Sequence, residues 1–112
     1  MLYLAFRFYE RTGDLAAAEQ MLERWLAISG RDAETADTAA ALGNLGLIYR
    51  TRGDLDRAEE MHKKALAIEE KLGHQEGMAA DYGNLGLVYQ TRGDLDRAEE
   101  MHKKSLAIEE KL

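Results

Sequence analysis

The stretch TRGDLDRAEEMHKK occupies residues 51–64 and returns without change at residues 91–104. Aligning the chain with itself at a shift of 40 residues extends the match to residues 43–72 over 83–112, where 27 of 30 positions are identical. The three differences are Ile48/Val88, Arg50/Gln90 and Ala65/Ser105. A repeat of this length predicts an array of stacked units, each burying its apolar face against its neighbours.

A third, diverged unit opens the chain. The same shift places YERTGDL at residues 9–15 over YRTRGDL at residues 49–55. We therefore expect one domain over residues 1–112, with a diverged unit at about 1–31, a second at about 32–73 and a third at about 74–112. The atypical first unit suggests either a cap of the array or the remnant of a longer one.

The apolar spacing within each unit is helical. The first run shares one face through Leu42, Leu45, Gly46 and Tyr49, and the second run shares another through Leu55, Ala58, His62, Ala65 and Leu72. Proline is absent from the chain, and glycines are the only strong breakers between the runs. The pattern predicts two helices per unit and an all-α fold.

The Arg-Gly-Asp tripeptide within each copy has two interpretations. As the corner of a helical hairpin, Gly53 would end one helix in the left-handed conformation and Asp54 would cap the next. As an exposed ligand for cell adhesion, the tripeptide would need its arginine. The first unit keeps Thr12-Gly13-Asp14 without that arginine, which favours the corner.

The composition excludes several classes of function. The net charge of −6 opposes non-specific binding to nucleic acid and to anionic membranes. Without cysteine the chain has no disulfide, thiolate zinc site or cysteine nucleophile. Arg7 and Glu10 interrupt the opening apolar stretch where a signal peptide needs continuity, and no apolar run reaches the roughly 18 residues of a membrane span. We expect a cytoplasmic protein.

Particular residues resemble a known family. The second unit contains LGLIY at residues 45–49, followed by Ala58 and His62, and the third unit has Tyr82 ahead of LGLVY at residues 85–89. This pattern resembles the tetratricopeptide repeat. The 40-residue period resembles the lengthened variety found in kinesin light chains and spindle-orientation adaptors. The resemblance implies a right-handed α-solenoid of three stacked helix-turn-helix hairpins that acts as a protein interaction scaffold without catalysis or cofactor.

Some positions depart from or refine that pattern. Each unit lacks the family's closing proline, and Phe6 and Trp25 replace small residues in the first unit. Small residues at Gly46 and Ala58 would let the two helices of a hairpin approach closely. The next unit would be packed by Met61, Ala65, Ile68 and Leu72. Their counterparts after the third unit, Met101, Ser105 and Ile108, should lie partly open and could support self-association into a homo-oligomer.

The resemblance also implies a binding surface, because the first helix of each hairpin lines the concave face of such arrays. The outward positions of these helices are Arg7, Arg11, Asn44, Leu47, Arg50, Thr51, Asn84, Leu87, Gln90 and Thr91. We call this set the stripe. Asn44 and Asn84 fall where such repeats place an asparagine that grips a peptide main chain, and the arginines favour an acidic or neutral segment. Ala80 and Asn84 stand where the family's chaperone clamp has cations, which disfavours a chaperone co-factor.

Two alternatives compete with a peptide-binding scaffold. Glu59-x-x-His62 and Glu99-x-x-His102 are typical of di-iron carboxylate enzymes, but the first helices supply no inward glutamate to complete such a site. In the simpler interpretation the histidines fill the family's aromatic core position, and Glu59 and Glu60 pair with Lys63 and Lys64. An RNA-reading helical array is opposed by the acidic charge. We expect no bound metal and no nucleic acid partner.

Overall fold

A computed structural model of the chain describes residues 14–30 and 32–112. It divides into two compact units, Met1–Ala33 and Glu34–Leu112. The described part of the first unit is helix α2, Leu15–Ser29, which buries Ala18, Leu22 and Leu26 along one side. Asp14 caps its start by accepting a hydrogen bond from the Ala17 backbone N–H at 3.0 Å.

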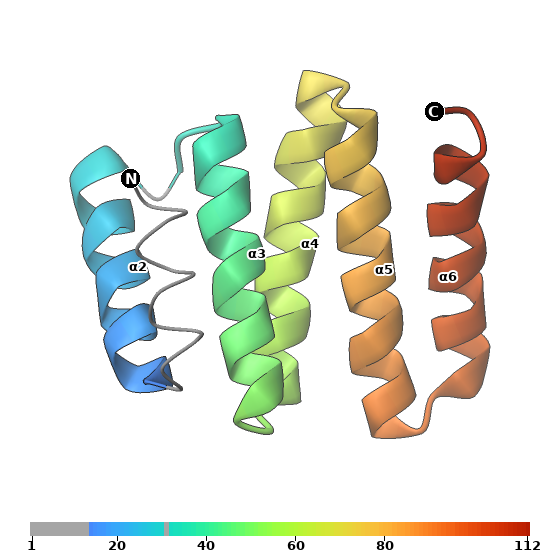
Figure 1. Ribbon diagram of the computed structural model, residues 1–112, viewed down its shortest axis with the longest axis horizontal. Coiled ribbons are helices and arrows are strands. Elements are labelled where there is room, and N and C mark those ends of the chain that lie inside the picture. The colour runs from blue at the N-terminus through green and yellow to red at the C-terminus, as the bar shows by residue number, and fades with distance from the viewer. Residues whose placement is uncertain (1–13, 31) are drawn as a thin grey trace. The chain divides into compact units, whose positions relative to one another are not determined.

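The second unit holds four helices in two hairpins. These are α3 (Ala36–Thr51), α4 (Leu55–Leu72), α5 (Gln75–Arg92) and α6 (Leu95–Glu109). Each helix packs on the next along the chain, and α3 also touches α5 (Figure 1). The part of the chain that the structure describes contains no strand. The predicted all-α stack of helical hairpins is confirmed, whereas the extent of the domain and the unit boundaries stay predictions.

The Arg-Gly-Asp tripeptides are hairpin corners, as predicted. Gly53 and Gly93 have φ of 84° and 83°, in the left-handed region that favours glycine. The Asp54 N–H donates to the Tyr49 carbonyl at 2.9 Å, which satisfies a carbonyl at the end of α3. The Asp54 carboxylate then accepts from the Arg57 N–H at 3.2 Å at the start of α4. Local chemistry therefore fixes where each hairpin turns.

The two helices of each hairpin approach closely because a glycine lies at their contact, again as predicted. A Cβ added at Gly46 would lie 2.5 to 2.9 Å from three ring atoms of His62, and one at Gly86 would lie 2.6 to 2.8 Å from the ring of His102. His62 is fully buried in the aromatic core position, whereas His102 is exposed. The same contact therefore belongs to the core in one hairpin and to the surface in the other.

Two packing predictions were wrong. Leu72 was expected to pack on the next unit but is 48% exposed. The buried Glu69 fills the contact with the start of α5 instead, and it leaves no room for a Cβ at Gly77. Ser105 was expected to lie open but is buried, because its hydroxyl donates to the Ala79 carbonyl at 2.8 Å within its own hairpin.

Candidate functional site

Most of the predicted stripe lies on α3 and α5. Asn44, Leu47 and Arg50 of α3 are half-buried, as are Asn84 and Leu87 of α5, and Gln90 is exposed. The structure brings these two parts together, because α3 and α5 are in contact. Arg7 and Arg11 lie outside the described residues.

The two asparagines and the two threonines of the stripe differ in whether their side chains already have a hydrogen-bond partner. Thr51 and Thr91 donate their hydroxyls to the Leu47 and Leu87 carbonyls at 2.9 and 2.8 Å, so these donors serve their own helices. Among residues 14–30 and 32–112, nothing hydrogen-bonds to the side-chain amide of Asn44 or Asn84. An amide both donates and accepts, so each remains available to a ligand's main chain.

Arg50 gives the stripe a positive charge next to the core. Its Nε is buried without a hydrogen-bond partner among the described residues, and so are both ring nitrogens of His62. Burial lowers the pKa of His62 to about 4, and the charge of Arg50 adds to this shift. The imidazole is therefore neutral at pH 7, and it does not add a second cation beside Arg50.

A buried acidic cluster at the junction of α4 and α5 was missed from the sequence. It consists of Glu69 and Asp81, both buried, with the half-exposed His74 paired to Glu69. Burial raises the pKa of Asp81 to about 7, and the charge of Glu69 adds to it. One signal was present in the sequence: Asp81 stands where the second repeat has Ala41, and Gly77 stands where it has Asp37.

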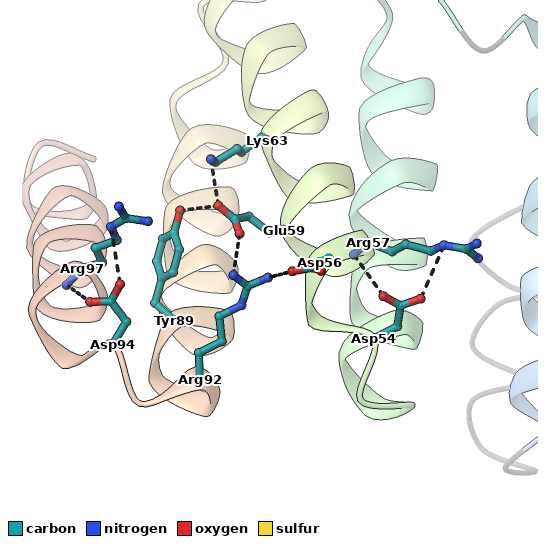
Figure 2. A network of polar contacts seen from close by, with 9 residues as sticks. All are labelled: Asp54, Asp56, Arg57, Glu59, Lys63, Tyr89, Arg92, Asp94 and Arg97. Carbon is teal, nitrogen blue, oxygen red and sulfur yellow. Dashed lines mark hydrogen bonds and ion pairs between the residues drawn. The ribbon is translucent and has the colours of Figure 1, made fainter.

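A second polar network joins α4 to α5 (Figure 2). Glu59 accepts a hydrogen bond from Tyr89 at 2.8 Å and forms ion pairs with Lys63 at 2.8 Å and Arg92 at 3.2 Å. Arg92 also pairs with Asp56 at 2.5 Å. Burial alone would raise the pKa of Glu59, but its bonds to Lys63 and Tyr89 and the neighbouring cations outweigh that, so the pKa is lowered.

The predicted pairs of glutamate and lysine within α4 are confirmed, since Glu60 also pairs with Lys64 at 3.2 Å. The contribution of α5 to the network was not foreseen, because Tyr89 and Arg92 lie 30 and 36 residues along the chain from their partners. An open hollow of about 550 Å³ lies beside this network on α4, lined by Asp56, Glu59, Glu60, Lys63, Lys64 and Ala67. It includes no residue of the stripe.

The structure does not bring the two Glu-x-x-His pairs together. Their helices, α4 and α6, are not in contact. His62 faces Gly46 in the core, while Glu59 faces α5. Within residues 14–30 and 32–112, no group of three or more His, Asp or Glu side chains is placed to hold a metal ion.

None of the described helices combines the length and the apolar character that crossing a membrane requires.

The family model for the tetratricopeptide repeat matches residues 7–71 and 37–111. No protein with a curated description matches the chain. Among solved structures, BtubC (BKLC) from P. vanneervenii is 31% identical with a TM-score of 0.90, over 99% of this chain and 45% of its own.

Two further structures are similar. A putative kinesin light chain from Podosopora anserina with nearly identical repeats is 25% identical with a TM-score of 0.83, over 98% of this chain and 54% of its own. MamA is 30% identical with a TM-score of 0.76, over 98% of this chain and 57% of its own. The chain thus spans about half the length of these proteins. It belongs to the tetratricopeptide repeat family, whose members serve as scaffolds for protein–protein interaction.

Proposed function

We propose that the chain binds an extended segment of a partner protein along the stripe of α3 and α5, without catalysis. The observation that carries this proposal is the pair of asparagines on touching helices whose amides have no partner among the described residues. Asparagine weakens a helix interior, so two such residues at equivalent positions are costly unless a ligand uses them.

The chemistry of the stripe suggests the kind of segment. Leu47 and Leu87 lie half-buried beside the asparagines and offer apolar contact to alternate side chains of an extended peptide. Arg50 is half-buried and adds a cation to the stripe, although the chain as a whole carries a charge of −6. We therefore propose an acidic or neutral segment as the ligand.

Peptides selected from a random library for binding to this chain provide the probe. Replacing both asparagines (Asn44→Ala, Asn84→Ala) should weaken their binding at least about fivefold, because each lost amide removes hydrogen bonds to the peptide main chain. The same change should raise helix stability, since alanine is the better helix former by about 0.5 kcal/mol per site.

The matched control replaces Thr51→Ala and Thr91→Ala on the same helices. Their hydroxyls already bond to Leu47 and Leu87, so peptide affinity should stay the same. If the asparagine variant binds the selected peptides as well as the unmodified chain does, the ligand site lies elsewhere.

We also propose that the chain associates with itself through the side of α6 that holds Met101 and Ile108, both half-buried. Ser105 belongs to the packing of its own hairpin and is left out of this surface.

A further inference from the structure

Two buried acidic side chains, Glu69 and Asp81, lie at the contact between the two hairpins of the second unit. Glu69, near the end of α4, is 4% exposed, and Asp81 of α5 is 6% exposed. The Asp81 carboxyl also reaches α3, because its Oδ1 atom would lie 4.0 Å from a Cβ added at Gly43. Asp81 therefore lies where α3, α4 and α5 meet. We call Glu69 and Asp81 the acidic pair.

The surroundings of Asp81 offer no partner for a negative charge. Its Oδ2 atom is buried and has no hydrogen-bond partner in the part of the chain that the structure describes. Within that part, Glu69 is the charged group whose field acts on Asp81, and no charged side chain of α3 or α6 contributes. His74, at the start of α5, forms its ion pair with Glu69. Because two negative charges repel in a buried site, the packing seen here requires a proton on the acidic pair.

The acidic pair is not a general feature of the repeat. The second unit has Ala41 where the third has Asp81, and it has Asp37 where the third has Gly77. A Cβ at Gly77 would overlap the carboxyl group of Glu69, so the absence of a side chain there makes room for Glu69. The two differences together introduce one acid and make space for another at a single contact.

We propose that proton uptake and release by the acidic pair controls how closely α5 packs on α3, and through this the separation of Asn44 and Asn84 in the stripe. This inference rests on the proposed peptide-binding function and adds a means of regulating that site by pH.

The acidic pair lies directly beside the stripe. Gly43, which Asp81 approaches, precedes Asn44 on α3. On α5, Asp81 and Asn84 are three residues apart, so they are neighbours on the surface of the helix. A change in the packing of α5 on α3 at Asp81 therefore changes the separation of the two asparagines. An extended peptide that bonds to both asparagines then loses the arrangement it binds.

The direction of the effect follows from the charges. Burial and the charge of Glu69 raise the pKa of Asp81 to about 7. Below pH 7 the acidic pair retains a proton, and α5 packs on α3 as the structure shows. Above pH 7 the proton leaves, and the two charges are stabilised when water reaches them. The contact between α3 and α5 therefore widens as the pH rises.

The other end of α5 stays in place during this change. Tyr89 donates a hydrogen bond to Glu59 of α4, and Arg92 forms an ion pair with the same carboxylate (Figure 2). These contacts join opposite charges and polar partners, so loss of a proton from Asp81 does not weaken them. The movement is thus confined to the part of α5 that carries Asp81 and Asn84.

The separation of α3 and α5 is measured without any ligand. Ala40 and Ala80 are exposed, occupy equivalent positions on α3 and α5, and precede the two asparagines by four residues. The chain has no cysteine, so Ala40→Cys and Ala80→Cys provide two unique sites for spin labels. Electron paramagnetic resonance should show one separation at pH 5.5 and a second, longer one that gains population towards pH 8.5. The ratio of the two should rise by up to about tenfold per pH unit above pH 7, the limit for release of one proton.

Three variants of the labelled chain identify the titrating group. Asp81→Asn keeps the shape of the side chain and cannot lose a proton, so its label separation should keep the value of pH 5.5 throughout. Glu69→Gln removes the repelling charge, so the longer separation should be less populated above pH 7. His74→Gln is the matched control, because it removes the imidazole of the cluster and leaves Asp81 in place, and its transition should persist. The pKa of His62, about 4, lies below this pH range.

Peptides selected for binding to the chain at pH 5.5 test the regulation of the stripe. The peptides are N-acetylated and contain neither histidine nor cysteine, so they do not themselves titrate near neutral pH. Their affinity for the unmodified chain should fall at least about fivefold between pH 5.5 and pH 8.5. Their affinity for the Asp81→Asn variant should stay constant over the same range.

An unchanged label separation between pH 5.5 and pH 8.5 would overturn the proposal. A change that persists in Asp81→Asn, or one that disappears in His74→Gln, would overturn it as well. A change in separation without a change in peptide affinity would rule out control of the stripe. If Asn44→Ala, Asn84→Ala leaves peptide binding intact, the stripe proposal fails, but the label separation of the ligand-free chain keeps its dependence on Asp81. The two failures are therefore distinguishable.

Discussion

At the residue scale, burial shifts the pKa values of two titratable side chains in opposite directions. The pKa of His62 falls to about 4 and that of Asp81 rises to about 7, because burial disfavours the charged form of each. His62 contributes stability above its unfolded pKa that is lost as the pH falls towards 4. Asp81 contributes stability below its unfolded pKa that is lost as the pH rises through 7. Between these pH values the two effects oppose each other.

Replacing Asp81→Ala should therefore stabilise the protein at neutral and alkaline pH. The second repeat already carries Ala41 at this position, where it is fully buried, so alanine suits the site. Relative to the unmodified chain, the gain in the free energy of unfolding should increase between pH 4 and pH 8 by at least about 1.4 kcal/mol, the equivalent of one pKa unit.

Urea unfolding at several pH values measures this gain. Asp81→Asn keeps the shape of the side chain and removes its titration. The gain in the free energy of unfolding should therefore depend on pH in the same way as for Asp81→Ala. A gain that is equal at pH 4 and pH 8 would mean that the Asp81 carboxyl titrates normally in the folded protein.

At the scale of helices, both hairpins contain the same contact between a glycine and a histidine ring, but the ring is free to move in only one of them. Gly46 lies against the His62 ring, which is fully buried in the core, and Gly86 lies against the ring of the exposed His102. A buried ring cannot move without disturbing its neighbours, whereas an exposed one can turn into solvent. The cost of a methyl group at the two glycines should therefore differ.

We expect Gly46→Ala to destabilise the chain by about 1 to 3 kcal/mol, since overpacking the core outweighs the better helix propensity of alanine. Gly86→Ala should be close to neutral or stabilising by up to about 1 kcal/mol, because propensity then dominates. Thermal unfolding followed by circular dichroism compares the two variants under one set of conditions. Equal destabilisation by both would show that His102 is held as firmly as His62.

The sequence and the structure agree best within single helices and their corners. The capping aspartates, the left-handed glycines and the Glu59–Lys63 pair involve residues at most four positions apart, so the chain pattern alone predicts them. Leu72 and Ser105 were placed wrongly because their surroundings depend on other helices. At Leu72 the space beside α5 is filled by Glu69, and at Ser105 a carbonyl of α5 accepts the hydroxyl.

At the scale of the whole molecule, the uncovered side of α6 leads to a prediction of self-association. Met61 and Ile68 are buried in α4, whereas their counterparts Met101 and Ile108 in α6 are half-buried, and the apolar surface left exposed gains free energy when a second copy covers it. Light scattering over a concentration series should show a mass above the 12.6 kDa of one chain at high concentration. A particle that stays at that mass up to millimolar concentration would contradict the prediction.

A Met101→Glu, Ile108→Glu variant should remove the association, because it introduces charges into the surface that would be covered. The control Met21→Glu introduces one such charge on a different helix, α2, at a half-buried position, and should leave any association through α6 in place. Circular dichroism checks that each variant keeps its helices.

The sequence by itself determined the repeating unit, the two helices within it, the glycine–aspartate corners and the resemblance that the family match confirms. These features follow from spacing along the chain, where helix periodicity and backbone conformation are local properties. It also pointed to Asn44 and Asn84 as equivalent positions, although their role in binding stays a prediction.

Only the tertiary structure decided how copies of one sequence differ. It buries His62 and exposes His102, and it covers Glu59 with Tyr89 and Arg92 while Glu99 stays open. It also places the carboxyl groups of Glu69 and Asp81 in one buried cluster, although they are 12 residues apart. The physical reason is that burial and pairing depend on which helix packs against each face, so residues with identical neighbours in sequence acquire different environments in space.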